Sequence, residues 1–265
     1  MAPTYLDEIL ERHRCRAALD GRDWRERIAD VHYDGPSLRE ALVDRANPHV
    51  KVIAEVKRRS PRRGWLNEYL KATEMASAYA NGGATGVSVL TEEDSFAGSV
   101  EDLVEVSRVV SLPLLRKDFT VGPNDVLDTA AMGASTVLLI VAALADDELR
   151  DLLVLAETCG LDALVEVHDR EEAGRALDAG ARMIGINQRN LATFEVDPTR
   201  AASVIDALPA SALTVCESGL GSVSDVRRAA AAGFDAVLVG EVFVTSSAVE
   251  EMVRSFASVP WVGRG

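Results

Sequence analysis

The sequence has few cysteines and no long apolar segment. Its three cysteines, Cys15, Cys159 and Cys216, are odd in number and far apart, a spacing that fits neither a disulfide framework nor a zinc site. No apolar run reaches the roughly 18 residues that a membrane span needs. The acidic start of the chain lacks the apolar core of a signal peptide. We therefore expect a cytoplasmic protein with no membrane attachment.

Basic residues and histidines are also scarce. Lys and Arg total 28 against 42 Asp and Glu, which gives a formal net charge of −14. No broad electropositive surface for nucleic acid or an anionic membrane is expected, so any anionic ligand must be held by a local cluster of donors. The histidines show no shared metal spacing, and we predict no metal site; they are His13, His32, His49 and His168.

Short β-branched runs separated by helical stretches fill the chain from Val50 onward. This alternation is typical of βα units and a parallel sheet. The runs are centred at eight positions: Ile53, Ser88, Leu115, Leu138, Val165, Gly185, Val215 and Leu238. Eight such units predict a closed (β/α)8 TIM barrel of the α/β class. An open, doubly wound sheet is the alternative, but no strand–helix junction carries the Gly-rich dinucleotide fingerprint.

A helical extension is predicted ahead of the first run. Residues 5–20 show helical periodicity. One face of this segment carries Leu6, Ile9, Leu10 and His13. A second short helix is predicted after Ser37, a suitable N-cap. The chain has no low-complexity stretch or Pro/Gly/Ser-rich linker, so we expect residues 1–48 to pack on a barrel of residues 49–265 as a single domain.

Charged side chains end several of the predicted strands. Alternate side chains of a strand share a face, so Glu55 and Lys57 point the same way as Ile53. Charge on an inward face costs on the order of several kcal/mol unless it is paired or used. In a TIM barrel the carboxyl ends of the strands form the active site. The residues that we expect to converge there are Glu55, Lys57, Lys117, Glu166, Asn187 and Glu217.

Small residues follow the last two runs. They form the segments Ser218-Gly219-Leu220-Gly221-Ser222 and Gly240-Glu241. Loops after strands seven and eight are the common phosphate site of TIM barrels, where backbone N–H groups receive the anion. Ordinary turn glycines would give the same pattern. The hydroxyl of Ser60, after the first run, is a further candidate phosphate contact.

In these residues the chain resembles the indole-3-glycerol phosphate synthase family over nearly its whole length. The resemblance rests on the following segments in order: Glu55 and Lys57 with Ser60-Pro61, Thr91-Glu92 with Phe96, Arg116-Lys117-Asp118-Phe119, Leu138, Glu166-Val167-His168, Asn187 with Arg189-Asn190-Leu191, Glu217-Ser218-Gly219, and Gly240-Glu241. Arg62 stands where the family usually has a second serine. The resemblance therefore does not predict the conformation of the first loop.

The resemblance implies a lyase of tryptophan biosynthesis that needs no metal or organic cofactor. Its phosphorylated small-molecule substrate would be 1-(2-carboxyphenylamino)-1-deoxyribulose 5-phosphate, converted by ring closure, decarboxylation and dehydration. Lys117 would be the general acid for ring closure, Glu166 a general base in dehydration, and Lys57 an assisting acid and substrate anchor. His168, just beyond Glu166, is predicted to be a surface or supporting residue rather than a catalyst.

The resemblance also implies roles for the remaining site residues. The catalytic lysines and the substrate hydroxyls would be held by Glu55, Asn187 and Glu217. Arg189 would lie near the mouth of the site. The pocket for the anthranilate ring would be lined by Phe96, Phe119 and Leu138. The phosphate would be bound by Ser60, Ser218, Gly219, Gly240 and Glu241.

Other functions on the same fold are alternatives. A Schiff-base aldolase would use Lys57 or Lys117 as an amine nucleophile. A phosphoribosyl isomerase would use an acid/base Asp or Cys pair in place of two strand-end lysines. A barrel kept only for binding is a third alternative, since a fold alone does not prove activity. Nothing in the sequence indicates other enzymes of the tryptophan pathway as partners.

Overall fold

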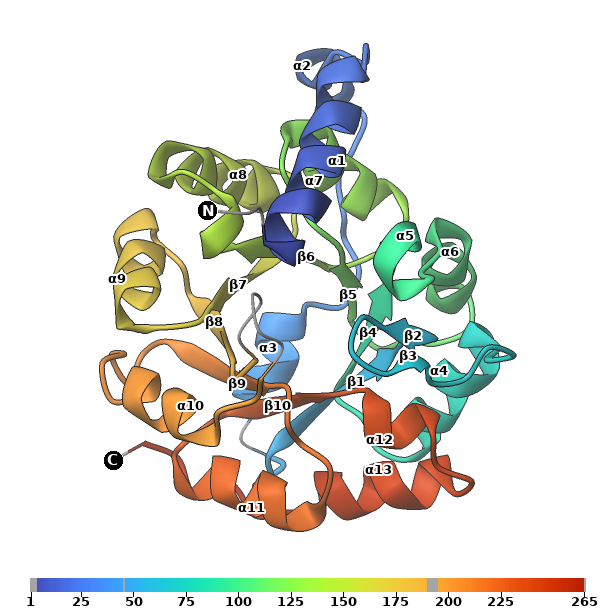
Figure 1. Cartoon of the computed structure of the whole chain (residues 1–265), viewed down its shortest axis with the longest axis vertical. Helices are drawn as coiled ribbons and strands as arrows, with labels where there is room; N and C mark the ends of the chain where they lie inside the picture. The colour runs from blue at the N-terminus through green and yellow to red at the C-terminus, as the bar shows by residue number, and fades with distance from the viewer. Residues whose placement is uncertain (1–3, 45, 190–194, 265) are drawn as a thin grey trace.

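The computed structural model describes residues 4–44, 46–189 and 195–264, and it forms a closed parallel barrel. The strands are β1 (Lys51–Val56), β4 (Gly86–Leu90), β5 (Leu114–Lys117), β6 (Thr136–Ile140), β7 (Asp162–Val167), β8 (Met183–Asn187), β9 (Leu213–Glu217) and β10 (Ala236–Val239). Each strand pairs with the next, and β10 pairs with β1 (Figure 1). The predicted TIM barrel is confirmed, and the open sheet is wrong.

Helices surround the barrel on its outer face (Figure 1). The covering helices are α4 (Ala72–Asn81), α6 (Val100–Ser107), α7 (Pro123–Ala131), α8 (Asp146–Thr158), α9 (Arg170–Ala179), α10 (Pro198–Ile205), α11 (Val223–Ala231) and α13 (Val249–Ala257). Shorter pieces lie in the loops after β4, β6 and β10: α5 (Glu93–Phe96), η1 (Val141–Ala143) and α12 (Glu241–Val244). Strands covered on both faces are mostly apolar, and all five residues of β6 are buried.

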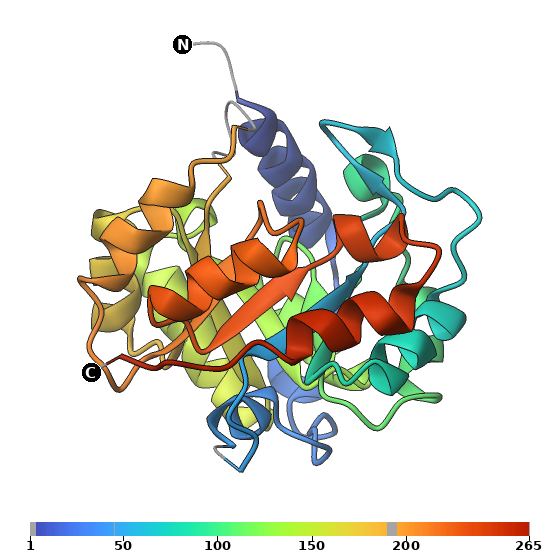
Figure 2. The ribbon, with the colours of Figure 1, turned by 90° about the horizontal axis from the view of Figure 1, so that it is seen from below.

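The N-terminal extension contacts both ends of the barrel. Its helices are α1 (Tyr5–Leu19), α2 (Trp24–Arg27) and α3 (Leu38–Val43), and Figure 2 shows α1 and α3 at opposite ends. Arg14 of α1 donates to the carbonyl of Ala143, just beyond the carboxyl end of β6. Ser37 caps α3 as predicted and also donates to Asp162, at the start of β7. The extension therefore leaves α1 beside the carboxyl ends of the strands.

The loop after β1 folds as a small hairpin that the sequence did not predict. Its strands are β2 (Arg59–Ser60) and β3 (Gly64–Trp65), which pair antiparallel. Gly64 has a φ of +69°, a left-handed conformation that glycine adopts without steric cost. The Trp65 side chain lies on the surface, with 52% of its area exposed. The hairpin projects from the same end of the barrel as the charged strand ends.

A buried tyrosine ties α4 to the end of β1. Tyr79 is fully buried, and its hydroxyl donates to the backbone carbonyl of Glu55 at 2.9 Å. We expect Tyr79→Phe to lower the free energy of unfolding by about 1 kcal/mol, because the carbonyl then lacks its donor. Chemical denaturation measures this. The matched control is Tyr69→Phe at a side chain that is 88% exposed; an equal loss in both variants would contradict the role of the hydrogen bond.

Candidate active site

A cavity of about 520 Å³ lies at the carboxyl ends of the barrel strands. Every residue predicted for the site lines it: Glu55, Lys57, Ser60, Phe96, Lys117, Phe119, Leu138, Glu166, Asn187, Arg189, Glu217, Ser218, Gly219, Gly240 and Glu241. Parallel strands bring their carboxyl ends to one face, which explains how residues far apart in sequence meet. Asn190 and Leu191, part of the family motif, lie outside the described residues. The individual roles of the lining residues stay predictions.

Lys117 occupies the centre of the polar side of the cavity. Its ammonium donates to Glu166 Oε2 at 2.6 Å and to Glu217 Oε2 at 3.2 Å. Burial disfavours the charged form, but the carboxylates of Glu166, Glu217 and then Glu55 outweigh it and raise the pKa of Lys117 above its ordinary value. Lys117 is therefore a cation held in a fixed position, and it can act as a proton donor.

Glu166 is held by three neighbours. Besides Lys117, Asn187 donates to its Oε1 at 3.0 Å, and His168 Nε2 lies 3.5 Å from the same oxygen. Burial alone would raise the pKa of Glu166, but the positive charges of Lys117 and His168 lower it below its ordinary value. Glu166 is therefore a carboxylate with a fixed orientation, which is the form that accepts a proton.

The pKa of Glu217 is shifted in the opposite direction to that of Glu166. Burial raises the pKa of Glu217 to about 7, with repulsion from Glu166 adding to the effect and attraction to Lys117 opposing it. Two carboxylates that share one lysine thus have pKa values pushed apart, which is how a site obtains an acid and a base from the same residue type.

Gly185 of β8 provides the space for Glu217. A Cβ atom built on Gly185 would lie 2.0 Å from Glu217 Oε1 and 3.1 Å from its Cδ. No side chain larger than hydrogen fits there without moving the carboxylate. Gly185 was predicted only as the centre of a strand. A glycine inside a strand often marks a close approach of another group, and this was the sign of its role.

Glu55 and Lys57 form an ion pair on the inner face of the end of β1. A Cβ atom on Gly240, after β10, would lie 2.8 Å from Glu55 Oε1. Gly240 thus makes room for Glu55 as Gly185 does for Glu217. The predicted inward direction of both charges is confirmed, and their pairing offsets part of the cost of burying them.

The segment after β9 has an unusual backbone. Ser218 and Gly219 have φ angles of +66° and +71°, and a left-handed conformation is uncommon for serine. Two hydrogen bonds hold Ser218 in place: its hydroxyl donates to Asn187 Oδ1 at 2.8 Å, and Gln188 Nε2 donates to its carbonyl at 2.9 Å. Backbone strain that the surroundings hold in this way is typical of functional sites.

The first-loop hairpin contacts α12 at the rim of the cavity. Arg63 pairs with the carboxylate of Glu241 at 2.5 Å, and its backbone N–H donates to the hydroxyl of Ser60 at 3.2 Å. The Arg63 guanidinium offsets the negative charge of Glu241 at the end of the cavity that is predicted to bind phosphate. No role was predicted for Arg63, because an arginine in a loop gives no sign of its partner in the sequence.

His168 is not a surface residue. It is 7% exposed, and its Nδ1 lies 2.9 Å from Glu172 Oε2 while Nε2 faces Glu166. Burial opposes its protonation, but the nearby carboxylates of Glu166 and Glu172 raise its pKa to about 10. The prediction of a surface position is wrong, and that of a supporting residue agrees with these contacts. The sequence offered one sign of this position, the carboxylate of Glu172 four residues beyond His168, within reach of its side chain.

Comparison with known proteins agrees with this geometry. The sequence model of the indole-3-glycerol phosphate synthase family matches residues 7–256. The chain belongs to this family. It is 45% identical to the indole-3-glycerol phosphate synthase of Rhodococcus jostii (strain RHA1), with 96% of each chain covered. The enzyme of that name from Micrococcus luteus is 46% identical, with 95% of this chain and 96% of the relative covered.

The activity of the family is that of a decarboxylating lyase of tryptophan biosynthesis.

Among solved structures, a thiamine phosphate pyrophosphorylase from Pyrococcus furiosus superposes with a TM-score of 0.59 at 15% identity, covering 80% of this chain and 95% of the other. That likeness concerns the fold alone. None of the helices in the described part of the chain has the length and apolarity of a membrane span, and its His, Cys, Asp and Glu residues form no group that could hold a metal ion.

The space at Gly185 leads to a direct test. We expect Gly185→Ala to lower kcat by about a hundredfold. The new methyl group displaces Glu217 from Lys117, so the Lys117 ammonium loses its fixed position as the acid. Steady-state kinetics measure this on folded protein. The matched control is Gly174→Ala in α9, where nothing lies within 4 Å of the added Cβ. Wild-type kcat in Gly185→Ala would contradict the role of this space.

The charge of His168 predicts a pH effect. The pKa of His168 is raised to about 10. At neutral pH His168 is therefore a cation, and its charge keeps the pKa of Glu166 low. His168→Gln removes this charge, the pKa of Glu166 rises, and the acid limb of the kcat/KM profile moves to higher pH. His49→Gln, at the opposite end of the barrel, is the control. An unmoved acid limb in His168→Gln would rule out this electrostatic support.

Proposed function

We propose that Lys117, Glu166 and Lys57 carry out the chemistry of indole-3-glycerol phosphate synthesis in this cavity. The substrate is 1-(2-carboxyphenylamino)-1-deoxyribulose 5-phosphate. One observation carries the proposal: the Lys117 ammonium lies at hydrogen-bond distance from two carboxylates whose environments differ. This observation supports a proton donor and a proton acceptor that act on the same substrate.

Ring closure needs an acid at the substrate ketone. The ring carbon that bears the carboxylate attacks the ketone carbon, and the Lys117 ammonium gives its proton to the ketone oxygen, which becomes a hydroxyl. The new bond makes the ring nitrogen an iminium. This iminium accepts the electron pair of the breaking carbon–carboxylate bond, and CO2 leaves. The substrate itself thus supplies the electron sink.

Dehydration then restores aromaticity. The hydroxyl formed in the first step leaves as water after protonation by a lysine, and Glu166 accepts the proton that is lost from the ring system. The lowered pKa of Glu166 keeps it in the form that accepts a proton. Lys57, paired with Glu55 on the neighbouring wall, anchors the substrate and assists as an acid.

The two ends of the cavity suit the two ends of the substrate. Phe96, Phe119 and Leu138 form the apolar end and suit the anthranilate ring. At the other end, Ser218 and Gly219 expose backbone in a left-handed conformation that binds anions well. We assign the phosphate to this second end. Its further contacts are Ser60, Gly240 and the backbone of Glu241, with Arg189 at the mouth.

The charge state of Lys117 argues against the aldolase alternative. A Schiff base forms from a neutral amine, whereas the carboxylates around Lys117 raise its pKa and keep it protonated. Borohydride treatment with a keto or aldehyde phosphate tests this point. We expect no covalent adduct on Lys117 or Lys57. A trapped adduct would support the aldolase.

The setting of the enzyme is a further part of the proposal. We infer a cytoplasmic location, supported by three cysteines that form no disulfide. We expect a phosphorylated small molecule, and no nucleic acid, as the partner of the cavity. We also propose that residues 1–48 and 49–265 form one domain. Buried Ile9 and Leu42 of the extension support this.

Replacement of Lys117 tests the proposed chemistry. We expect wild-type protein to convert the substrate to a product with indole fluorescence. Lys117→Met should lower kcat by a factor of about a hundred to ten thousand, the usual contribution of a general acid. Lys117→Arg keeps the positive charge between the two carboxylates, so it should fold even if Lys117→Met does not. Its kcat should also fall, because the guanidinium hardly releases a proton.

The control for this test is Lys71→Met, at a lysine that is 70% exposed and pairs with Glu74. It should turn over at the wild-type rate. Full activity in Lys117→Met would remove Lys117 as the acid. An inactive wild-type protein would contradict the proposed function itself.

A further inference from the structure

The two phenylalanines at the apolar end of the cavity are held in the same way. The backbone N–H of Phe96 donates to Glu92 Oε2 at 3.1 Å, and the backbone N–H of Phe119 donates to Asp118 Oδ1 at 2.8 Å. Both carboxylates are buried: Glu92 is 2% exposed and Asp118 is 8% exposed. Each ring of the aryl pocket thus depends on one buried carboxylate for the position of its backbone.

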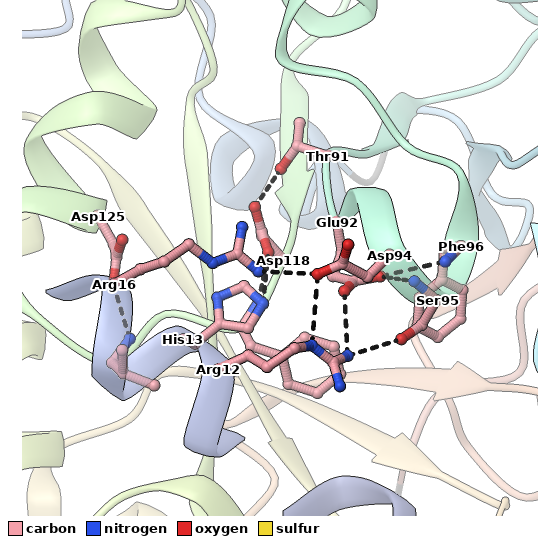
Figure 3. A network of polar contacts seen from close by, with 12 residues as sticks. Arg12, His13, Arg16, Thr91, Glu92, Asp94, Ser95, Phe96, Asp118 and Asp125 are labelled. Atoms are coloured by element: carbon pink, nitrogen blue, oxygen red, sulfur yellow. Dashed lines mark hydrogen bonds and ion pairs between the residues drawn. The ribbon is translucent and has the colours of Figure 1, made fainter. Parts of the chain in front are cut away.

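Two consecutive residues of α1 face these carboxylates (Figure 3). Arg12 Nη2 lies 3.8 Å from Glu92 Oε1 and donates to the hydroxyl of Ser95 at 3.2 Å. His13 Nε2 lies 3.8 Å from Asp118 Oδ1, and the imidazole packs on the ring of Phe119 with centroids 5.5 Å apart. The helix therefore contacts both walls of the pocket from outside the barrel.

We propose that Arg12 and His13 are positioning residues that fix Phe96 and Phe119 as the walls of the aryl pocket. The inference rests on the proposed function for the identity of the aryl ligand. Neither residue lines the cavity, so each acts through a carboxylate or a ring that it contacts. The N-terminal helix thereby sets how tightly the enzyme holds the aromatic half of its substrate.

The local structure explains why the Phe96 wall needs such support. Phe96 ends α5, a helix of four residues, and helices this short have little stability of their own. Glu92 caps the helix through the N–H groups of Ser95 and Phe96. Arg12 offsets the charge of this buried cap and bonds the Ser95 side chain. Removing Arg12 leaves Glu92 buried with less compensation.

The Phe119 wall continues directly from the proposed acid. Asp118, between Lys117 and Phe119, accepts from Thr91 Oγ1 at 2.5 Å and from Arg116 Nη2 at 2.9 Å. These bonds fix the backbone that follows Lys117. The ring of Phe119 itself is only partly buried. His13 covers one side of it with a side chain that is 10% exposed. Loss of the imidazole would let this ring change its orientation.

The test separates the aryl end of the cavity from the phosphate end. We expect Arg12→Met and His13→Ala to raise KM about threefold each and about tenfold together, with kcat within about twofold, as for lost binding that is equal in ground and transition states. Calorimetry should show about tenfold weaker binding of anthranilate to the double variant. Inorganic phosphate should bind as it does to wild type.

Two further variants separate a local role from loosening of the whole helix. His13→Phe keeps a ring against Phe119 and should recover most of the KM change of His13→Ala. Arg14→Gln breaks the ion pair of α1 with Glu148 at 3.0 Å, away from the aryl pocket, and should leave KM unchanged. Melting temperatures show whether each variant is folded. If the double variant is not folded, the KM values of the two single variants still test the inference.

Several results would overturn the inference. They are an unchanged KM and anthranilate affinity in the variants, equal weakening of anthranilate and phosphate, an equal effect of Arg14→Gln, a fall in kcat alone, or no anthranilate binding to wild type. Wild-type turnover with unaffected variants would reject this inference and keep the proposed function. Weakened anthranilate binding without wild-type turnover would keep the inference and reject that function.

Discussion

A lysine ammonium held between two buried carboxylates is the interaction on which the rest of the site depends. Three charges gathered at the end of a barrel would be costly to desolvate unless each compensated another. Lys117 compensates Glu166 and Glu217 at 2.6 and 3.2 Å. Burial raises the pKa of Glu217, whereas the positive charges of Lys117 and His168 lower the pKa of Glu166 and keep it ionised. Lys117 therefore keeps its proton, and Glu166 stays in the form that accepts one.

The surroundings of this cluster fix its geometry by both space and charge. Gly185 and Gly240 leave room for Glu217 and Glu55, and any Cβ at these glycines would press on a carboxylate. His168 adds a second positive charge beside Glu166. Arg12 and His13 of helix α1 lie beside the buried carboxylates of Glu92 and Asp118 that hold the aromatic wall (Figure 3). The barrel thus supplies positions, while groups outside the cavity adjust orientation and protonation.

Much of this could be predicted from the sequence, for definite physical reasons. Eight β-branched runs separated by helical stretches predicted the barrel. The alternation of side chains along a strand predicted that Glu55 and Lys57 point inward. Partners formed by tertiary structure could not be predicted in the same way. The pairing of Arg63 with Glu241 depends on a hairpin with no clear pattern. The sequence did not decide whether His168 lies at the surface or supports the site, because a single sequence does not show what covers a strand end. It also gave no sign of the contacts of Arg12 and His13.

The most direct test of the central claim is the protonation state of Lys117, observed by NMR of protein labelled with 15N at lysine Nζ. Lys117→Arg assigns the signal. The account predicts that the Lys117 ammonium persists to about pH 10 or above, at or beyond the ordinary lysine pKa, because Glu166 and Glu217 hold its proton. A Lys117 signal that becomes a neutral amine below about pH 9 would contradict the account, since the acid would then lack its proton-holding partners.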